Sequence, residues 1–96
     1  MPASFTAEIY LFSTTDSGRQ GPLPLGEWRT ILRVGEENWS ARLAYAGSPN
    51  PGERFVAIVR LLAPEASQFF PLGTEFTVLE RGNKGAGRVE SIVPEE

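Results

Sequence analysis

The chain of 96 residues contains no cysteine and no histidine. Without cysteine it can form neither a disulfide framework nor a thiolate metal site. Without histidine it lacks the side chain that most often serves as a general base, as a metal ligand or as a pH switch near neutrality. These absences exclude a disulfide-stabilised secreted scaffold and the commonest catalytic designs, and we expect the protein to use no metal and no cofactor.

Long hydrophobic runs are also missing. Residues 1–10 show no basic segment followed by an apolar stretch, and no later window approaches the about 20 apolar residues of a membrane-spanning helix. We therefore expect a cytoplasmic protein that does not associate with membranes. Hydrophobic residues make up 41% of the chain and charged residues 22%, which is typical of a globular protein. Residues 1–96 are expected to form one domain.

Basic charge is scarce. Nine basic residues stand against twelve acidic ones, so the net charge is −3 and does not draw the chain toward nucleic acid as a whole. Lys84 is the single lysine, and the other eight basic residues are arginines. Two interpretations stay open: a GC-rich genome, or selection for guanidinium contacts at an interface.

Glycine and proline interrupt the chain at short intervals, and between them apolar side chains recur with a period of two, which is typical of β-strands. The predicted strands are residues 5–11, 28–34, 39–45, 54–62, 74–81 and 87–93. Residues 54–62 are apolar on both faces, which predicts a central strand or one covered by a second layer. Residues 16–26 are expected to form a loop along a sheet edge. Six short strands predict an all-β fold, a compact antiparallel barrel or sandwich.

No segment carries a recognisable catalytic or nucleotide-binding motif. The glycine-rich segment Gly82–Gly87 lacks the helix and the Ser or Thr after Lys84 that a phosphate-binding loop needs. We interpret it as a hairpin turn with glycines at positive φ. The pairs Glu36-Glu37 and Glu95-Glu96 fall in a turn and in the tail, where they are solvated. We therefore predict that the protein binds no nucleotide and is not an enzyme.

Basic and aromatic side chains supply the candidate binding residues. The basic set for RNA or protein contacts is Arg19, Arg29, Arg33, Arg81, Lys84 and Arg88. Arg29 and Arg33 lie four residues apart on a predicted strand, about 13 Å along one face, which could contact successive phosphates. The alternative is that these arginines only solvate the barrel exterior. A possible apolar docking patch comprises Trp28, Phe69, Phe70 and Leu72, although Trp28 also suits the core or a barrel end.

Motifs near both ends of the chain follow a familiar order. Two parts of the chain resemble the opening and closing stretches of one family. The first part is the segment 5–13 with Gly18-Arg19 and Pro22, and the second comprises the segments 55–62, 73–76 and 85–89. That family is the C-terminal β-barrel (third domain) of bacterial elongation factor Tu. The resemblance covers about residues 5–93 and implies a six-stranded closed antiparallel barrel. In the family this barrel contacts the T-stem of tRNA, the exchange factor and the GTPase domain.

The matched and changed positions set the functional expectation. The family pattern is matched at Arg19, Arg33 and the run Gly85–Gly87. The hairpin, which in the family is of the type R-E-G-G-R-T-V, is one residue shorter here, with Leu79 and Asn83-Lys84 at the changed positions. We expect a free-standing, non-catalytic binding module, and a protein-interaction domain in the first place. The alternative is a translation-associated accessory that binds tRNA or other RNA through an arginine stripe.

Overall fold

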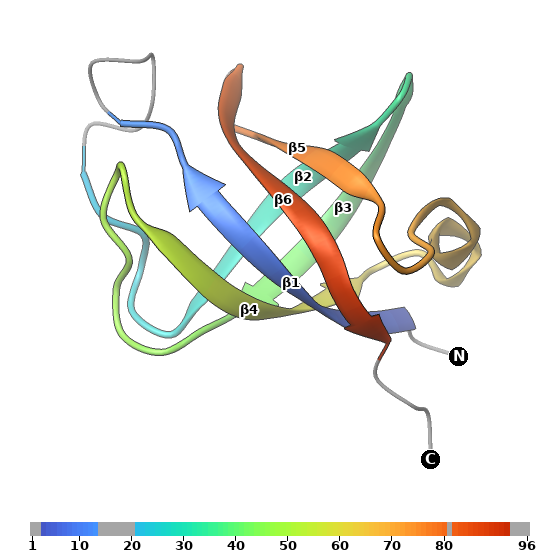
Figure 1. Cartoon of the computed structure of the whole chain (residues 1–96), viewed down its shortest axis with the longest axis horizontal. Helices are drawn as coiled ribbons and strands as arrows, with labels where there is room; N and C mark the ends of the chain where they lie inside the picture. The colour runs from blue at the N-terminus through green and yellow to red at the C-terminus, as the bar shows by residue number, and fades with distance from the viewer. Residues whose placement is uncertain (1–2, 14–20, 81, 93–96) are drawn as a thin grey trace.

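A closed barrel of six antiparallel strands forms the protein (Figure 1). The computed structural model describes residues 3–13, 21–80 and 82–92. The strands are β1 (Ala3–Leu11), β2 (Glu27–Val34), β3 (Glu37–Ala44), β4 (Arg54–Leu61), β5 (Glu75–Leu79) and β6 (Asn83–Ile92). Around the barrel their order is β1-β4-β3-β2-β5-β6, and the pairing of β6 with β1 closes the sheet. The predicted all-β, six-stranded closed antiparallel barrel is thus confirmed.

The period-two pattern separates a packed interior from the outer surface. In β1 the side chains of Phe5, Ala7, Ile9 and Leu11 are buried, while Glu8 faces outward. The other strands contribute their alternate residues in the same way, and the buried set includes Trp28, Leu32, Ala41, Leu43, Ala57, Val59, Leu61, Phe76, Val78 and Val89. Because this interior is filled by side chains, whatever the barrel binds must meet its outside.

The short 3-10 helix η2 (Pro64–Phe69) follows β4 and packs against β1 and β4. Ala66 and Phe70 at this helix are buried in the core. The Phe70 ring stacks on Phe5 at a centroid distance of 5.3 Å and meets Phe76 edge-on at 5.8 Å. This segment therefore adds aromatic rings to the core rather than to the surface. No helix in the described part of the chain is long and apolar enough to cross a membrane.

The glycine-rich segment differs from its interpretation as a turn. Only Gly82 has a positive φ, of 105°, whereas Gly85 and Gly87 lie inside β6 with ordinary strand geometry. A Cβ atom on Gly85 would lie 2.7 Å from the carbonyl oxygen of Tyr10, and one on Gly87 would lie 2.5 Å from the ring of Phe76. These glycines are therefore required by close packing, and β6 begins four residues earlier than predicted.

The apolar outer face of β4 is open. Val56 and Ile58 are exposed, and β4 pairs with β1 on one side and β3 on the other. Of the two alternatives for this strand, the central position is therefore correct, and no second layer among the described residues covers it. Its branched side chains become part of the outer surface, where Val56 lies opposite Glu8 of β1 and Ile58 lies opposite Ala44 of β3.

Candidate functional site

As far as the structure describes it, the predicted basic set lies on two strands: Arg29 and Arg33 on β2, and Arg88 with the half-buried Lys84 on β6. Arg29 and Arg33 both point outward from β2. Arg33 lies opposite Thr77 of β5, and Arg88 of β6 lies opposite Glu75 of the same strand. Arg33 and Arg88 therefore flank β5, while Arg29 lies opposite Arg42 of β3. Arg19 and Arg81 fall outside the described residues.

The predicted apolar docking patch is wrong. Trp28 is only 6% exposed and Phe70 only 2%, because both fill the barrel interior. Phe69 is partly buried and stacks on Trp39 with 5.4 Å between the ring centroids. Leu72 alone of the four is well exposed, at 67%. The physical reason is that aromatic side chains next to the proline- and glycine-rich breaks are drawn into the barrel, where their large apolar area is removed from water.

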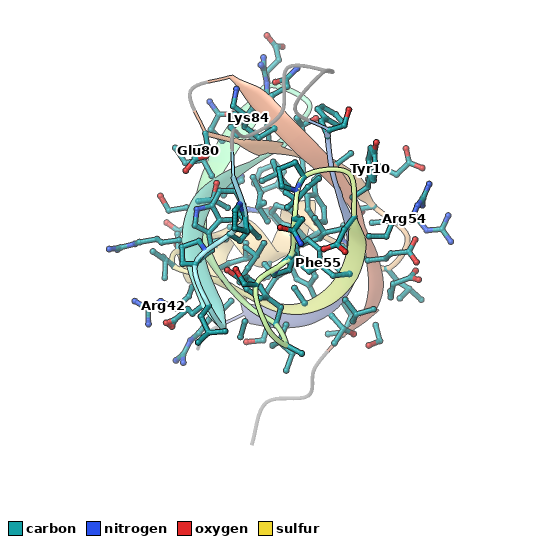
Figure 2. All side chains as sticks on the ribbon, turned by 90° about the vertical axis from the view of Figure 1, so that its left-hand side faces the viewer. Tyr10, Arg42, Arg54, Phe55, Glu80 and Lys84 are labelled. Carbon is teal, nitrogen blue, oxygen red and sulfur yellow. The ribbon has the colours of Figure 1, made fainter. Side chains whose placement is uncertain are left out.

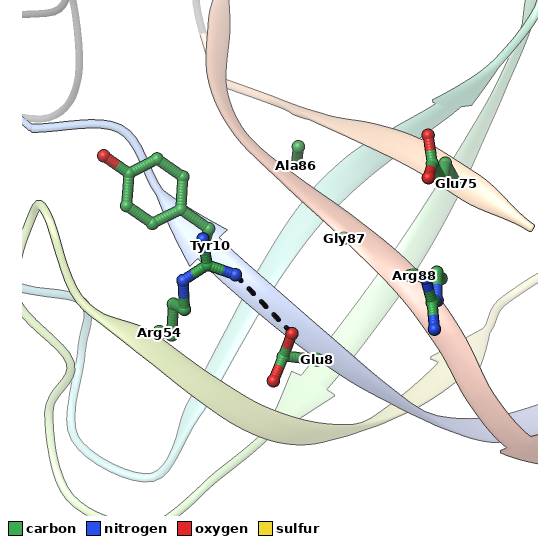
Figure 3. Close-up of a pocket in the computed structure, with 7 residues that line it drawn as sticks. All are labelled: Glu8, Tyr10, Arg54, Glu75, Ala86, Gly87 and Arg88. Atoms are coloured by element: carbon green, nitrogen blue, oxygen red, sulfur yellow. Dashed lines mark ion pairs between the residues drawn. The ribbon is translucent and has the colours of Figure 1, made fainter. Parts of the chain in front are cut away.

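A shallow hollow of about 390 Å³ lies over β1 and β6 (Figure 3). Ala86 and Gly87 contribute to its lining together with charged side chains on both sides of β6. The Arg54 guanidinium lies 5.4 Å from the centre of the Tyr10 ring, a cation–π distance, and its Nη1 atom is 3.7 Å from Oε1 of Glu8. Glu75 and Arg88 line the other side. Two carboxylates thus balance two guanidinium groups, so the hollow presents no excess charge.

A second hollow of about 370 Å³ adjoins the first. Arg33, Thr77 and Asn83 line it, and it shares Glu75 and Ala86 with its neighbour. The strand register explains the depression, since the small side chain of Ala86 lies between Thr77 of β5 and Tyr10 of β1. Both hollows are wide and polar, which differs from the enclosed apolar clefts that hold small ligands.

A row of three arginines crosses the opposite part of the barrel. Arg29 of β2 lies directly opposite Arg42 of β3, and Arg42 lies directly opposite Arg60 of β4. All three side chains are exposed. Seen along the barrel, Arg42 and Arg54 point outward on opposite sides (Figure 2). The prediction from the sequence chose Arg29 but omitted Arg42 and Arg60 from the candidate site, and only the strand register brings the three together.

Exposed aliphatic side chains flank this row on both sides. Ile58 precedes Arg60 by two positions on β4, and it lies opposite the exposed Ala44 of β3. On the other side are Ile31 of β2 and Leu62, whose backbone N–H donates to the carbonyl oxygen of Ser40. Ile58 is 52% exposed, Ile31 42% and Leu62 39%. We define the arginine face as the outer surface formed by Arg29, Arg42, Arg60, Ile31, Ala44, Ile58 and Leu62; Glu27, opposite Ala44, and Ser40, opposite Ile31, lie within it.

The arginine face and the two hollows can contact a partner through ion pairs and apolar contacts. No group of three or more acidic, histidine or cysteine side chains within residues 3–13, 21–80 and 82–92 is placed to hold a metal ion. The arginine face combines guanidinium groups, which bind carboxylates or phosphates bidentately, with aliphatic area that gains free energy on leaving water.

Comparison with known proteins shows no match of the chain to any family model and no matching curated protein. The similarity to the third domain of elongation factor Tu therefore stays a resemblance based on the order of motifs.

Proposed function

We propose that this barrel is a non-catalytic protein-interaction module that docks through the arginine face. The observation that carries the proposal is the exposure of Ile31, Ile58 and Leu62 around a row of arginines. Protein interfaces combine apolar area with arginine, and the other charged residues are depleted at their centres. Exposed apolar side chains that gather on one face of a small domain, here on both sides of the arginine row, are typical of an interaction site.

The resemblance to the third domain of elongation factor Tu supports this function. That resemblance implies a six-stranded closed barrel, and in the family such a barrel works by contacting other macromolecules without chemistry of its own. The matched positions that the structure describes are Arg33 and the run Gly85–Gly87. Gly85 and Gly87 support the packing of β6, so the match at these two glycines concerns the scaffold, and the binding surface is argued from this chain's own residues.

RNA binding is the second candidate function. The observation in its favour is the same row of Arg29, Arg42 and Arg60, because guanidinium groups also bind phosphates. A protein that binds RNA through such contacts loses affinity steeply as the salt concentration rises.

Affinity capture from host lysate, with and without nuclease treatment, tests the proposed function. We compare the unmodified protein with Ile58→Asp, which places a charge in the arginine face, and with Leu72→Asp, which places the same charge at another exposed leucine. Thermal unfolding confirms that both variants are folded. Protein partners that resist nuclease, disappear with Ile58→Asp and persist with Leu72→Asp support docking through this face.

Other outcomes reject the proposal. Partners that are lost on nuclease treatment favour RNA binding instead. Partners retained equally by both variants place the interface elsewhere on the barrel, and the absence of any captured protein removes the interaction function.

A further inference from the structure

We infer that the partner of the arginine face is an acidic protein segment whose carboxylates are flanked by aliphatic side chains, an inference that depends on the proposed docking function. Three like charges stand directly opposite one another on adjacent strands, Arg29 to Arg42 and Arg42 to Arg60. Side chains in such positions have Cβ atoms about 4.5–5.5 Å apart, and like charges there destabilise a sheet. The fold itself gains nothing from this arrangement.

Two acidic side chains lie beside the row among the residues that the structure describes: Glu27, and Glu80, which lines a hollow of about 330 Å³ together with Arg29. Oε2 of Glu27 lies 3.8 Å from Nε of Arg42, and no ion pair is formed by Arg29 or Arg60 within the described chain. Three positive charges against two negative charges thus lie together, a local positive excess on a chain whose net charge is −3. This local excess is complementary to a negatively charged partner.

Carboxylates and phosphates both suit a guanidinium group, and the flanking residues distinguish them. Single-stranded nucleic acids are held by aromatic side chains on which bases stack. The apolar side chains that flank the row are aliphatic, namely Ile31, Ile58 and Leu62. Branched aliphatic side chains offer no stacking platform, but they pack well against the aliphatic side chains of another protein. The observations therefore favour an acidic protein segment over RNA.

The size of the arginine face limits the length of this segment. The row spans two gaps between adjacent strands, about 10 Å, and the flanking residues lie two positions away along each strand, about 7 Å on either side. A helix covers 10 Å in about seven residues, and an extended chain covers it in about three. A segment of about 16 residues is therefore long enough to cover the face in either conformation.

A display library of random 16-residue peptides tests the inference directly. Three proteins are used for selection: the unmodified barrel, the variant R29Q/R42Q/R60Q, and the matched control R33Q/R54Q/R88Q, which removes the same charge from the hollows over β1, β5 and β6. We expect peptides enriched in Asp or Glu together with Leu, Ile or Val on the unmodified barrel and on the control. We expect that enrichment to disappear with the row variant.

Binding measured by fluorescence anisotropy then separates the alternatives. The best selected peptide should bind the row variant roughly tenfold more weakly, about two- to threefold for each of three exposed ion pairs, and the control variant almost normally. Acidic peptides that bind the row variant equally well would overturn the inference. The inference would also be overturned if the selected peptides lacked acidic enrichment and their binding depended on Ile58. That result would leave the proposed protein docking intact.

Two further outcomes would also overturn it. Tighter binding of a 16-nucleotide oligouridine than of any selected peptide would assign the row to RNA. Self-association of the unmodified barrel in analytical ultracentrifugation, abolished in the row variant, would assign it to a second copy of this chain. Failure to select any peptide would count against both the inference and the docking function.

Discussion

Gly87→Ala is expected to destabilise the barrel even though alanine suits the strand conformation at this position. A Cβ atom here would lie 2.5 Å from Cζ of Phe76 and 3.1 Å from the carbonyl oxygen of Glu8. Carbon atoms in contact prefer about 3.5–4.0 Å, so the Phe76 ring would have to move by about 1 Å. It cannot move freely, because it packs edge-on against Phe5 at 6.1 Å and Phe70 at 5.8 Å.

The expected loss follows from these contacts. Overpacking in a core costs about 1–3 kcal/mol, and replacing glycine returns about 0.4–1 kcal/mol by restricting the unfolded chain. The free energy of unfolding should therefore fall by about 1–2 kcal/mol, and Tm should fall by about 5–15 °C for a domain of this size. Urea unfolding followed by tryptophan fluorescence measures the first quantity, and calorimetry measures the second.

A matched control and a double-mutant cycle test the cause. Gly21→Ala introduces a Cβ with nothing within 4 Å and should leave stability unchanged or slightly higher. Phe76→Leu should be destabilising alone but should relieve the clash, so that the double variant with Gly87→Ala is more stable than the sum of the two effects by at least about 0.5 kcal/mol. An additive cycle, or a Gly87→Ala protein as stable as the original, would refute the packing explanation.

Two further substitutions probe the outer face and the core. Arg42→Gln should raise the free energy of unfolding by about 0.3 kcal/mol at low salt, because it removes a charge that faces Arg29 and Arg60 and loses only one exposed ion pair, with Glu27. Arg33→Gln, whose strand neighbours are uncharged, should not raise it, and a gain with Arg42→Gln that persists in 1 M salt would contradict the electrostatic cause. Thr30→Val should lower stability by about 1 kcal/mol in urea unfolding, because the buried hydroxyl donates a 2.6 Å hydrogen bond to the carbonyl oxygen of Leu79; an unchanged midpoint would show that this bond contributes nothing.

The architecture could be predicted because it depends on local pattern. In β1 the alternation of Phe5, Ala7, Ile9 and Leu11 determines which face is buried, whatever the neighbouring strand is. Similar alternation in the other segments leaves an all-β structure as the only compact solution, and closure removes the free edges.

The surface could not be predicted in the same way, because it depends on the register between strands. Arg42 and Arg60 are 18 residues apart, and nothing local indicates that they face each other. Phe70 follows a short helix beside two prolines, where the sequence alone does not show that its ring fills the core. Gly87 resembles a turn glycine until the position of the Phe76 ring is known.

Arg42 lies between Ala41 and Leu43, whose side chains are completely buried. Its backbone is therefore held by the core on either side. Binding a partner would order only the Arg42 side chain, and such ordering costs about 0.5–1.5 kcal/mol of free energy per side chain. A preorganised surface of this kind loses little entropy on association. Its affinity can change through single exposed residues while the barrel that displays them stays rigid.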